Sequence, residues 1–328
     1  MSGYEVVLAD GSLVHASSEN HSDLYKALKG GGNQFGIVVS YTMRTFPIGP
    51  IWGGILTYAG NQSDPLMEAL HDYTTNYDPK SAIIVSCGGG ANSSFDIINL
   101  YVFYNAPEPP AQVFEKFLSV PFLNSAVKTQ NYSKLITSNG QYAEYGSRWL
   151  IQDQTFPNLP APAGVDLYKH HYNAFKATAA DHGKLHPSLI YSTAFQPLPV
   201  AIAHASKSAG GNVLGLSPED GDRMWIDYNV IWDDSSTDAD SYTFARDIVN
   251  SEEAYVLSFH TDLQNTNREP DGQAGLLERI SPLLMNNAQP DQPVLQRYGF
   301  QTYDWLRKIQ RKYDPEGLWF REGGFKYT

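Results

Sequence analysis

The stretch Leu28-Lys29-Gly30-Gly31-Gly32-Asn33-Gln34-Phe35-Gly36-Ile37-Val38-Val39 separates a helical pattern from an apolar, β-branched run. The three glycines end the helical pattern of residues 22–29, and a strand is expected from Ile37. Glycine permits positive φ and lets another group approach the backbone closely. The spacing matches neither a Walker loop nor a dinucleotide-binding glycine motif, because a strand follows the turn. The turn is therefore either a ligand-facing backbone or a tight helix-to-strand turn without a ligand.

The flanking residues place this turn in a longer pattern. Residues 5–14 indicate a β-hairpin with Asp10-Gly11 as its two-residue turn, and residues 41–47 a strand ended by Pro47. The closing part of the chain reads YGFQTYDWL from Tyr298, KYDPEGLWF from Lys312 and GGFK from Gly323. Together with VVLADGSLVHAS and DLYKALKGGGNQFGIVVSYTMRTFP, these motifs resemble berberine-bridge-like FAD-linked oxidases of the PCMH-type, vanillyl-alcohol-oxidase superfamily.

The resemblance implies an α+β fold with three consecutive segments. Residues 1–50 are similar to the second half of the PCMH-type FAD-binding domain. Residues 51–292 would form an antiparallel-sheet substrate domain backed by helices, and residues 293–328 would pack back on the first segment. If FAD is bound, the resemblance assigns its contacts to the following residues: Gly31, Gly32, Asn33, Phe35, Gly36, Tyr298 and Tyr303.

The chain also departs from the family pattern. The family begins with a further stretch that grips the FAD pyrophosphate, and the resemblance begins only after it. The closing motif carries Thr302 where the family usually has asparagine. On these grounds the sequence predicts an N-terminally truncated oxidase fold that uses no cofactor, with FAD as the alternative.

Composition limits the class of protein. The 328 residues are 42% hydrophobic and 18% charged, with a net charge of −12, as in a globular and not a disordered chain. No basic patch suggests nucleic-acid binding, and the single cysteine, Cys87, excludes an internal disulfide and a cysteine-rich zinc site. No signal peptide or membrane-spanning run is present, so we expect a cytoplasmic protein; sequons such as Asn20 and Asn61 leave secretion as an alternative.

The remaining patterns predict an antiparallel sheet with helices on one face. The expected strands are 52–58, 82–90, 95–104, 148–156, 188–196 and 224–232. The expected helices are 65–77, a helix ending near 118, 165–182, 200–206, 239–254 and 294–313. Residues 130–146 are polar and aromatic without a period, which indicates a loop over a pocket.

Candidate chemistry centres on the expected strand 224–232. Alternation puts Trp225, Asp227 and Asn229 on one face, where Asp227 could act as a general base and Arg148 could hold an anionic oxygen. Arg148 could equally pair with an acidic side chain such as Asp153, and a solvated face is the alternative for Asp227. The expected pocket walls are Tyr101, Tyr142, Gln196 and Trp225. The pairs His170-His171 and His182/His186 are interpreted as surface or capping residues, and no metal site is expected.

Three functions remain open on these grounds. The first is a non-redox, FAD-independent enzyme of secondary metabolism that cyclises, isomerises or dehydrates a hydrophobic small molecule. The second is an FAD-dependent oxidoreductase whose N-terminal half is trimmed or supplied by another chain. The third is a non-catalytic binding remnant. We expect the active cleft between the open sheet face and the glycine turn, and a homodimer that covers exposed apolar surface.

Overall fold

A computed structural model describes residues 1–90, 94–139, 146–259, 282–321 and 323–327. The chain divides into two compact units. Unit 1 comprises Met1–Phe46, Val200–Gly221 and Asp262–Thr328, and unit 2 comprises Pro47–Pro199 and Asp222–Thr261. Residues 200–221 thus belong to the same unit as both ends of the chain. Tyr142, an expected pocket wall, lies outside the described residues.

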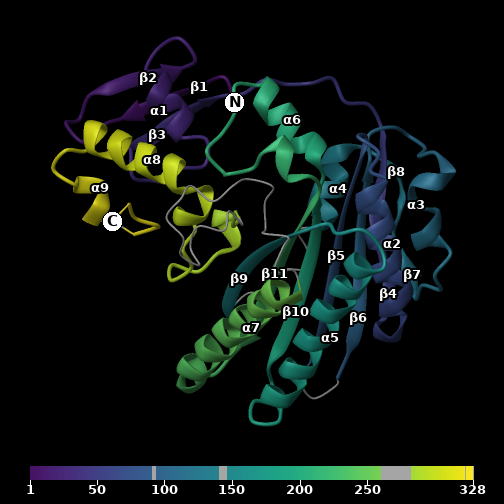
Figure 1. The fold of residues 1–328 in the computed structure, drawn as a ribbon. Helices are drawn as coiled ribbons and strands as arrows, with labels where there is room; N and C mark the ends of the chain where they lie inside the picture. Colours follow the sequence, from purple (N-terminus) through teal and green to yellow (C-terminus); the bar gives the residue numbers. More distant parts are fainter. Residues whose placement is uncertain (91–93, 140–145, 260–281, 322, 328) are drawn as a thin grey trace. The chain divides into compact units, whose positions relative to one another are not determined.

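Unit 2 contains an eight-stranded sheet (Figure 1). Its order is β7-β4-β6-β5-β10-β11-β9, with β8 also paired to β4, and every neighbouring pair is antiparallel. The strands are β4 (Ile51–Ala59), β5 (Ser81–Gly90), β6 (Asp96–Tyr104), β7 (Asn124–Ser125), β8 (Lys128–Gln130), β9 (Arg148–Pro157), β10 (Ile190–Leu198) and β11 (Arg223–Trp232).

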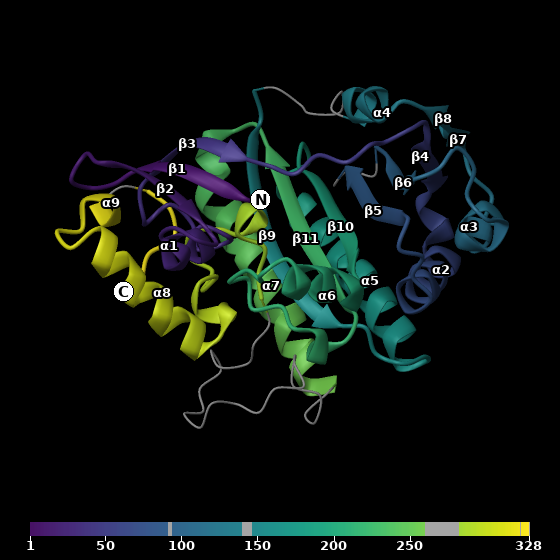
Figure 2. The same ribbon diagram turned by 90° about the horizontal axis from the view of Figure 1, so that it is seen from above.

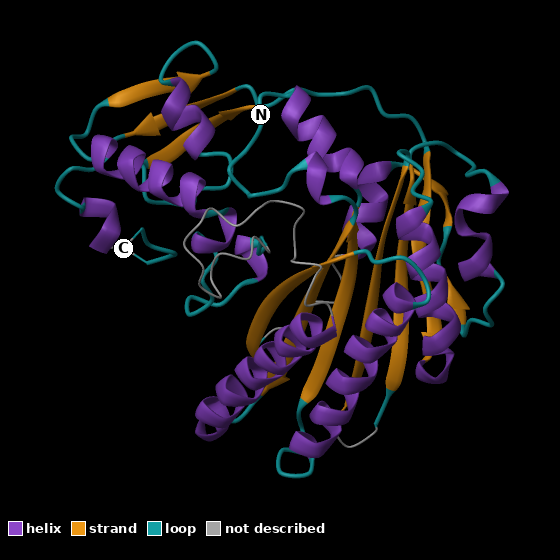
Figure 3. Ribbon diagram, viewed as in Figure 1, coloured by secondary structure: helices purple, strands orange, loops and turns teal. Residues whose placement is uncertain are grey.

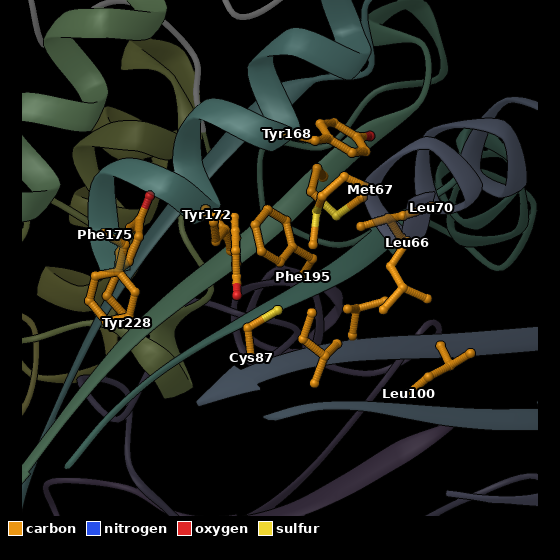
Figure 4. Packing of buried hydrophobic residues seen from close by; sticks show 14 of the residues in the cluster. Leu66, Met67, Leu70, Cys87, Leu100, Tyr168, Tyr172, Phe175, Phe195 and Tyr228 are labelled. Carbon is orange, nitrogen blue, oxygen red and sulfur yellow. The ribbon is translucent and has the colours of Figure 1, made fainter. Parts of the chain in front are cut away.

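Helices cover one face of this sheet (Figure 3). They are α2 (Ser63–Thr75), α3 (Ala111–Leu118), α5 (Ala163–Gly183) and α7 (Asp238–Phe259). Their apolar sides meet alternate strand residues in one core, where Tyr168, Phe175, Phe195 and Tyr228 pack together (Figure 4). The short helix α4 (Tyr132–Asn139) lies on the other side of the sheet (Figure 2).

The structure confirms the predicted α+β class and sharpens its details. The observed ends of the long strands lie within two residues of the expected ones, because their alternation matches a sheet covered on one face. Two expectations are corrected. Residues 132–139 form α4 instead of part of a loop. The last long helix begins at Phe300 and not at residue 294, because Gly299 has φ 93°, which is incompatible with a continuous helix.

Unit 1 contains a three-stranded sheet of order β2-β1-β3. Its elements are β1 (Gly3–Val7), β2 (Leu13–Ser17), α1 (Ser22–Ala27), β3 (Ile37–Thr42), α6 (Val200–Ser208), α8 (Phe300–Tyr313) and α9 (Leu318–Arg321). The hairpin turn is longer than predicted, since the Leu8 amide donates to the Ser12 carbonyl. Side chains of α1 and α8 pack on one face of β1 around Tyr4 and Val6. Among the described helices of both units, none is long and apolar enough to cross a membrane.

Candidate functional site

The glycine turn of unit 1, residues 30–36, is a strained backbone segment. Gly30, Gly32 and Gly36 have φ values of 115°, 81° and 147°, which disfavour residues with a side chain. A Cβ at Gly36 would lie 2.7 Å from the carbonyl oxygen of Val7, so close packing on β1 requires glycine there. A Cβ at Gly31 would lie 2.4 Å from the carbonyl oxygen of Ala27. The backbone of the turn therefore packs too closely against its neighbours at Gly31 and Gly36 for a side chain to fit.

The closing motif of the chain packs on this turn. The Tyr327 hydroxyl donates to the Gly31 carbonyl over 2.5 Å, and Asn33 Nδ2 donates to the Gly323 carbonyl over 2.9 Å. The ring of Tyr327 lies 5.7 Å from that of Phe35 and 5.8 Å from that of Tyr303. Burial is the main cause that raises the pKa of Tyr327 well above its usual range. These contacts bring Gly31, Asn33, Phe35 and Tyr303 into one cluster.

One buried polar atom beside the turn has no partner. The Gln34 side chain is fully buried, and its Nε2 lies 3.2 Å from Asn33 Oδ1. Its Oε1 accepts no hydrogen bond from any described residue. An orphaned buried acceptor costs free energy, and a flavin ring carries an N–H donor that could satisfy it. The bare backbone and this acceptor fit a bound flavin.

In unit 2, the described candidate residues other than Arg148 lie on the sheet face opposite α2, α5 and α7, which we call the open face. Ile226, Tyr228 and Val230 of β11 point into the helix-covered core. Neighbouring residues on a strand point to opposite faces, so Trp225, Asp227 and Asn229 lie on the open face. The same alternation places Tyr101 of β6 and Gln196 of β10 there, and Gln196 is the register partner of Trp225.

Asp227 is oriented by a chain of hydrogen bonds. Asn229 Nδ2 donates to Asp227 Oδ1 over 2.5 Å, and Trp149 Nε1 donates to Asn229 Oδ1 over 3.0 Å. Asp153 of β9 is the register partner of Asp227, so two carboxylates occupy neighbouring positions on the open face. The sequence interpretation missed Trp149 and treated Asp153 only as an ion-pair partner. The alternation of β9 could have placed both residues on the face of Asp227, with Asp153 opposite Asp227 and Trp149 opposite Ile231, had the pairing with β11 been known.

Arg148 does not join this group. It is the register partner of Trp232, five residues along β11 from Asp227, and it lies on the helix-covered face. Its guanidinium forms a two-pronged ion pair with Asp238 at the start of α7, at 2.5 and 2.7 Å. This pairing raises the pKa of Arg148 and lowers the pKa of Asp238. The structure therefore does not place Arg148 beside Asp227. It shows the alternative, an ion pair with an acidic side chain, with Asp238 and not Asp153 as the partner.

The interpretation of the histidines also needs correction. His171 is fully buried in the core of unit 2, with Nδ1 2.9 Å from the Tyr228 hydroxyl and 2.7 Å from Glu252 Oε2. His170 stacks on Tyr255, and His182 stacks on Phe244. These residues hold α5 against α7 and the sheet.

Comparisons with known proteins support the resemblance seen in the motifs. No protein-family model matches the chain. It is 30% identical over 329 residues to an uncharacterized FAD-linked oxidoreductase of Arthroderma benhamiae, covering 98% of this chain and 62% of that protein. It is 30% identical to the bifunctional solanapyrone synthase of Alternaria solani, covering 98% and 58%. The fold matches glucooligosaccharide oxidase from Acremonium strictum with a TM-score of 0.65 at 20% identity, covering 96% of this chain and 64% of that one.

These findings confirm the resemblance to FAD-linked oxidases and overturn one expectation. The curated relatives include an FAD-linked oxidoreductase and FAD-dependent monooxygenases, and the structure of the A. strictum oxidase is described with a 6-S-cysteinyl, 8α-N1-histidyl FAD. The prediction of a protein without a cofactor is therefore wrong. That prediction relied on Thr302 and on a resemblance that begins only after the family's first stretch. The chain spans only about 60% of the curated relatives it matches, such as the A. benhamiae protein at 62%.

Proposed function

We propose that this chain, which is similar to fungal FAD-linked oxidoreductases along 98% of its length, acts in the FAD-dependent oxidation of a hydrophobic small molecule of secondary metabolism. The end-to-end similarity to FAD-linked relatives is the observation that carries the proposal. The second of the three functions considered from the sequence is therefore preferred over the non-redox enzyme and the binding remnant.

Unit 1 supplies the residues that would hold the flavin. Gly32 offers backbone that no side chain covers, and Gln34 offers its unpartnered Oε1. Asn33 and Tyr303 lie in the same cluster through Gly323 and Tyr327. When bound, FAD supplies an acceptor for two electrons.

Unit 2 supplies the residues that would handle substrate and proton. Asp227 would accept a proton from a substrate hydroxyl, and Asn229 would hold the carboxylate in place. Trp225, Gln196 and Tyr101 would line the open face around the substrate. Apolar walls with a few polar groups are typical of small-molecule sites.

The pairing of Asp227 with Asp153 supports a functional role. Like charges directly opposite each other on neighbouring strands destabilise a sheet. Asp227 and Asp153 occupy such opposite positions on β11 and β9. Neighbouring carboxyl groups that lower the stability of the fold are typical of sites where a proton is transferred.

The first test is the response of the purified protein to FAD. A ligand that binds only the folded state adds about 2.7 kcal/mol of stability at a free concentration of 100 Kd. We expect the melting temperature to rise with FAD concentration, and riboflavin, which lacks the phosphates, to raise it less. A melting temperature independent of FAD would overturn the proposal.

The second test concerns the base. With FAD present, oxygen consumption is measured on a panel of benzylic and allylic alcohols. Asp227→Asn should lower turnover about 10²-fold or more, whereas the matched control Asp233→Asn, an exposed carboxylate just beyond β11, should not. Equal turnover in both variants would remove Asp227 from the mechanism.

A second candidate function has one observation in its favour. A relative covering 98% of this chain is named a bifunctional solanapyrone synthase. In this candidate, the enzyme catalyses a ring-forming or isomerising step in addition to oxidation. Product analysis by mass spectrometry would separate the two, since an isomerised or cyclised product keeps the mass of its precursor while an oxidised one loses two hydrogens.

A further inference from the structure

Unit 1 contains a groove that the proposed function does not use. Its volume is about 760 Å³, within the range of small-molecule sites. Its walls come from α1, the end of β2, the segment after β3, the end of α6 and α8. The walls include Ser22, Tyr25, Lys26, Arg44, Phe46 and Trp305. The groove includes no residue of the glycine turn and neither Tyr298 nor Tyr303, so it is separate from the candidate flavin contacts.

The groove concentrates positive charge on an acidic chain. The chain carries 35 acidic and 23 basic residues, yet no carboxylate of the described residues pairs with Lys26 or Arg44. A third cation, Lys29 Nζ, lies 4.0 Å from the position that a Cβ would occupy at Gly210, a wall residue. Asp23, the acid in the wall, is already bonded to Lys312 at 2.6 Å. The uncompensated charge at the groove is therefore positive.

Aromatic rings lie next to these cations. Lys26 Nζ lies 5.4 Å from the Trp305 ring centre, and Lys29 Nζ lies 4.0 Å from that of Tyr25. These cation–π contacts hold the two ammonium groups at the rings. Phe46 is 80% exposed, so its ring face is open to a planar ligand. Rings and cations side by side favour a ligand that is both flat and anionic.

The number of donors indicates the type of anion. Lys26 and Arg44 present several N–H groups, and hydroxyls of Ser18, Ser22 and Ser208 also line the groove. Charge-assisted hydrogen bonds to phosphate oxygens use such donors. A phosphate accepts more of these bonds than a carboxylate, and its two negative charges match two or three cations.

We propose that this groove is a second ligand site, specific for a small aromatic phosphate. The ring stacks on Phe46 and Trp305, and the phosphate is bound by Arg44 and Lys26. Because no residue of the glycine turn lines the groove, its ligand in this proposal is not the flavin.

Three probes separate the contributions of ring and charge: 1-naphthyl phosphate, 1-naphthol and inorganic phosphate. Isothermal titration calorimetry should show binding of 1-naphthyl phosphate and affinity weaker by about ten-fold or more for each of the other two, because each lacks one half of the interactions. Binding of 1-naphthyl phosphate should also weaken as salt rises. Equal affinity for 1-naphthol and its phosphate would overturn the proposal.

Variants locate the site. Lys26→Met/Arg44→Gln should lower the affinity for 1-naphthyl phosphate about ten-fold or more, and Phe46→Ser should also lower it. Lys308→Met is the matched control, since Lys308 is an exposed lysine of α8 paired with Asp304. All four residues are exposed, so the variants should keep the wild-type melting temperature. Wild-type affinity in the double variant would overturn the proposal.

The FAD-dependent rise in melting temperature serves as the independent readout. It should be unchanged in Lys26→Met/Arg44→Gln, because these residues lie outside the glycine turn. Loss of the FAD response in this variant would show that the groove belongs to the flavin site and would overturn its independence. An absent FAD response in the wild-type protein would instead contradict the proposed function and leave the binding of 1-naphthyl phosphate as a separate result.

Discussion

The two sheets differ in how their own unit covers them. In unit 2, α2, α3, α5 and α7 lie over one face of eight strands, and the side chains between them form one continuous core. In unit 1, α1 and α8 cover one face of three strands, while Ile37, Val39 and Tyr41 of the edge strand β3 are more than half exposed. Three strands with one helical layer are near the lower limit for independent stability.

In unit 2, the stabilising core and the candidate site lie on opposite faces of the same sheet. The core of unit 2 tolerates two neighbouring carboxylates on its open face, because burial on the other face supplies the stability. Unit 1 instead holds its glycine turn through single hydrogen bonds from Tyr327 and Asn33. Substitutions should therefore have large effects in the core of unit 2 and small effects on β3.

The largest effect is expected at His171. Its Nδ1 lies within hydrogen-bonding distance of both Glu252 and Tyr228, in the fully buried core. His171→Leu would remove the nearer imidazole from the buried Glu252 carboxylate and leave His170 Nε2, 3.6 Å away, beside it. Breaking a buried pair costs up to about 3–5 kcal/mol. Urea unfolding measures this loss.

A double variant is the control for that prediction. His171→Leu/Glu252→Leu removes both polar groups and should recover most of the lost unfolding free energy, since a buried pair can be replaced by apolar residues at little cost. A single variant that unfolds at the wild-type urea concentration would show that the pair contributes nothing, and the contrast between the units would lose its main support.

A matched pair of isoleucines tests the contrast directly. Ile226 in the core of unit 2 is 1% exposed, whereas Ile37 on β3 is 52% exposed. Ile226→Ala should cost about 2–5 kcal/mol, because it leaves a cavity. Ile37→Ala should change the unfolding free energy by about 0.5 kcal/mol or less. Similar losses in both variants would mean that β3 is covered in solution.

A smaller effect is expected from pH. Burial lowers the pKa of His170, with His171 adding to the effect and Glu252 opposing it. Burial and His186 lower the pKa of His182, with Asp240 opposing. Both histidines bind protons more tightly in the unfolded chain, whose pKa is near 6.5. The contribution of these two histidines to the unfolding free energy is therefore fully present above about pH 6.5. It is lost as the pH falls towards their pKa values in the folded protein.

Urea midpoints from pH 8 to pH 5 measure this decline. His182→Phe keeps the stacking on Phe244 but removes one titrating ring, so its midpoint should fall less steeply over the same range. A wild-type midpoint that rises below pH 6.5 would contradict the sign of both shifts.

The sequence predicted the large sheet well and the site only in part. Strands such as β6 alternate over their whole length, with Ile98, Leu100 and Val102 inside, so their existence and facing were visible. The helix α4 was missed because only Leu135 is buried in it. One buried residue gives a segment no helical period of apolar positions, so the sequence of α4 looks like that of a loop.

Site residues were harder because their partners are distant in sequence. Asp227 was placed on the correct strand face by alternation alone. Arg148 pairs with Asp238, 90 residues away, and no local pattern indicates that contact. The bond from Trp149 to Asn229 likewise depends on the register between β9 and β11, which a single sequence does not contain.

The smallest effect on stability is expected on the exposed strand of unit 1, where the change should instead be in assembly. Ile37 and Val39 of β3 are each more than half exposed, and exposed apolar surface often marks an interface. We propose that a second copy of the chain covers β3. Val39→Lys places a charge in that interface, while an exposed strand residue should change the unfolding free energy by about 0.5 kcal/mol or less. Sedimentation velocity should therefore show a wild-type dimer and a Val39→Lys monomer with the same urea midpoint at low protein concentration. Glu19→Lys, at an exposed position after β2, is the control for added charge. A wild-type monomer at all concentrations would disprove the dimer and leave the bare face of β3 as a lasting difference between the two sheets.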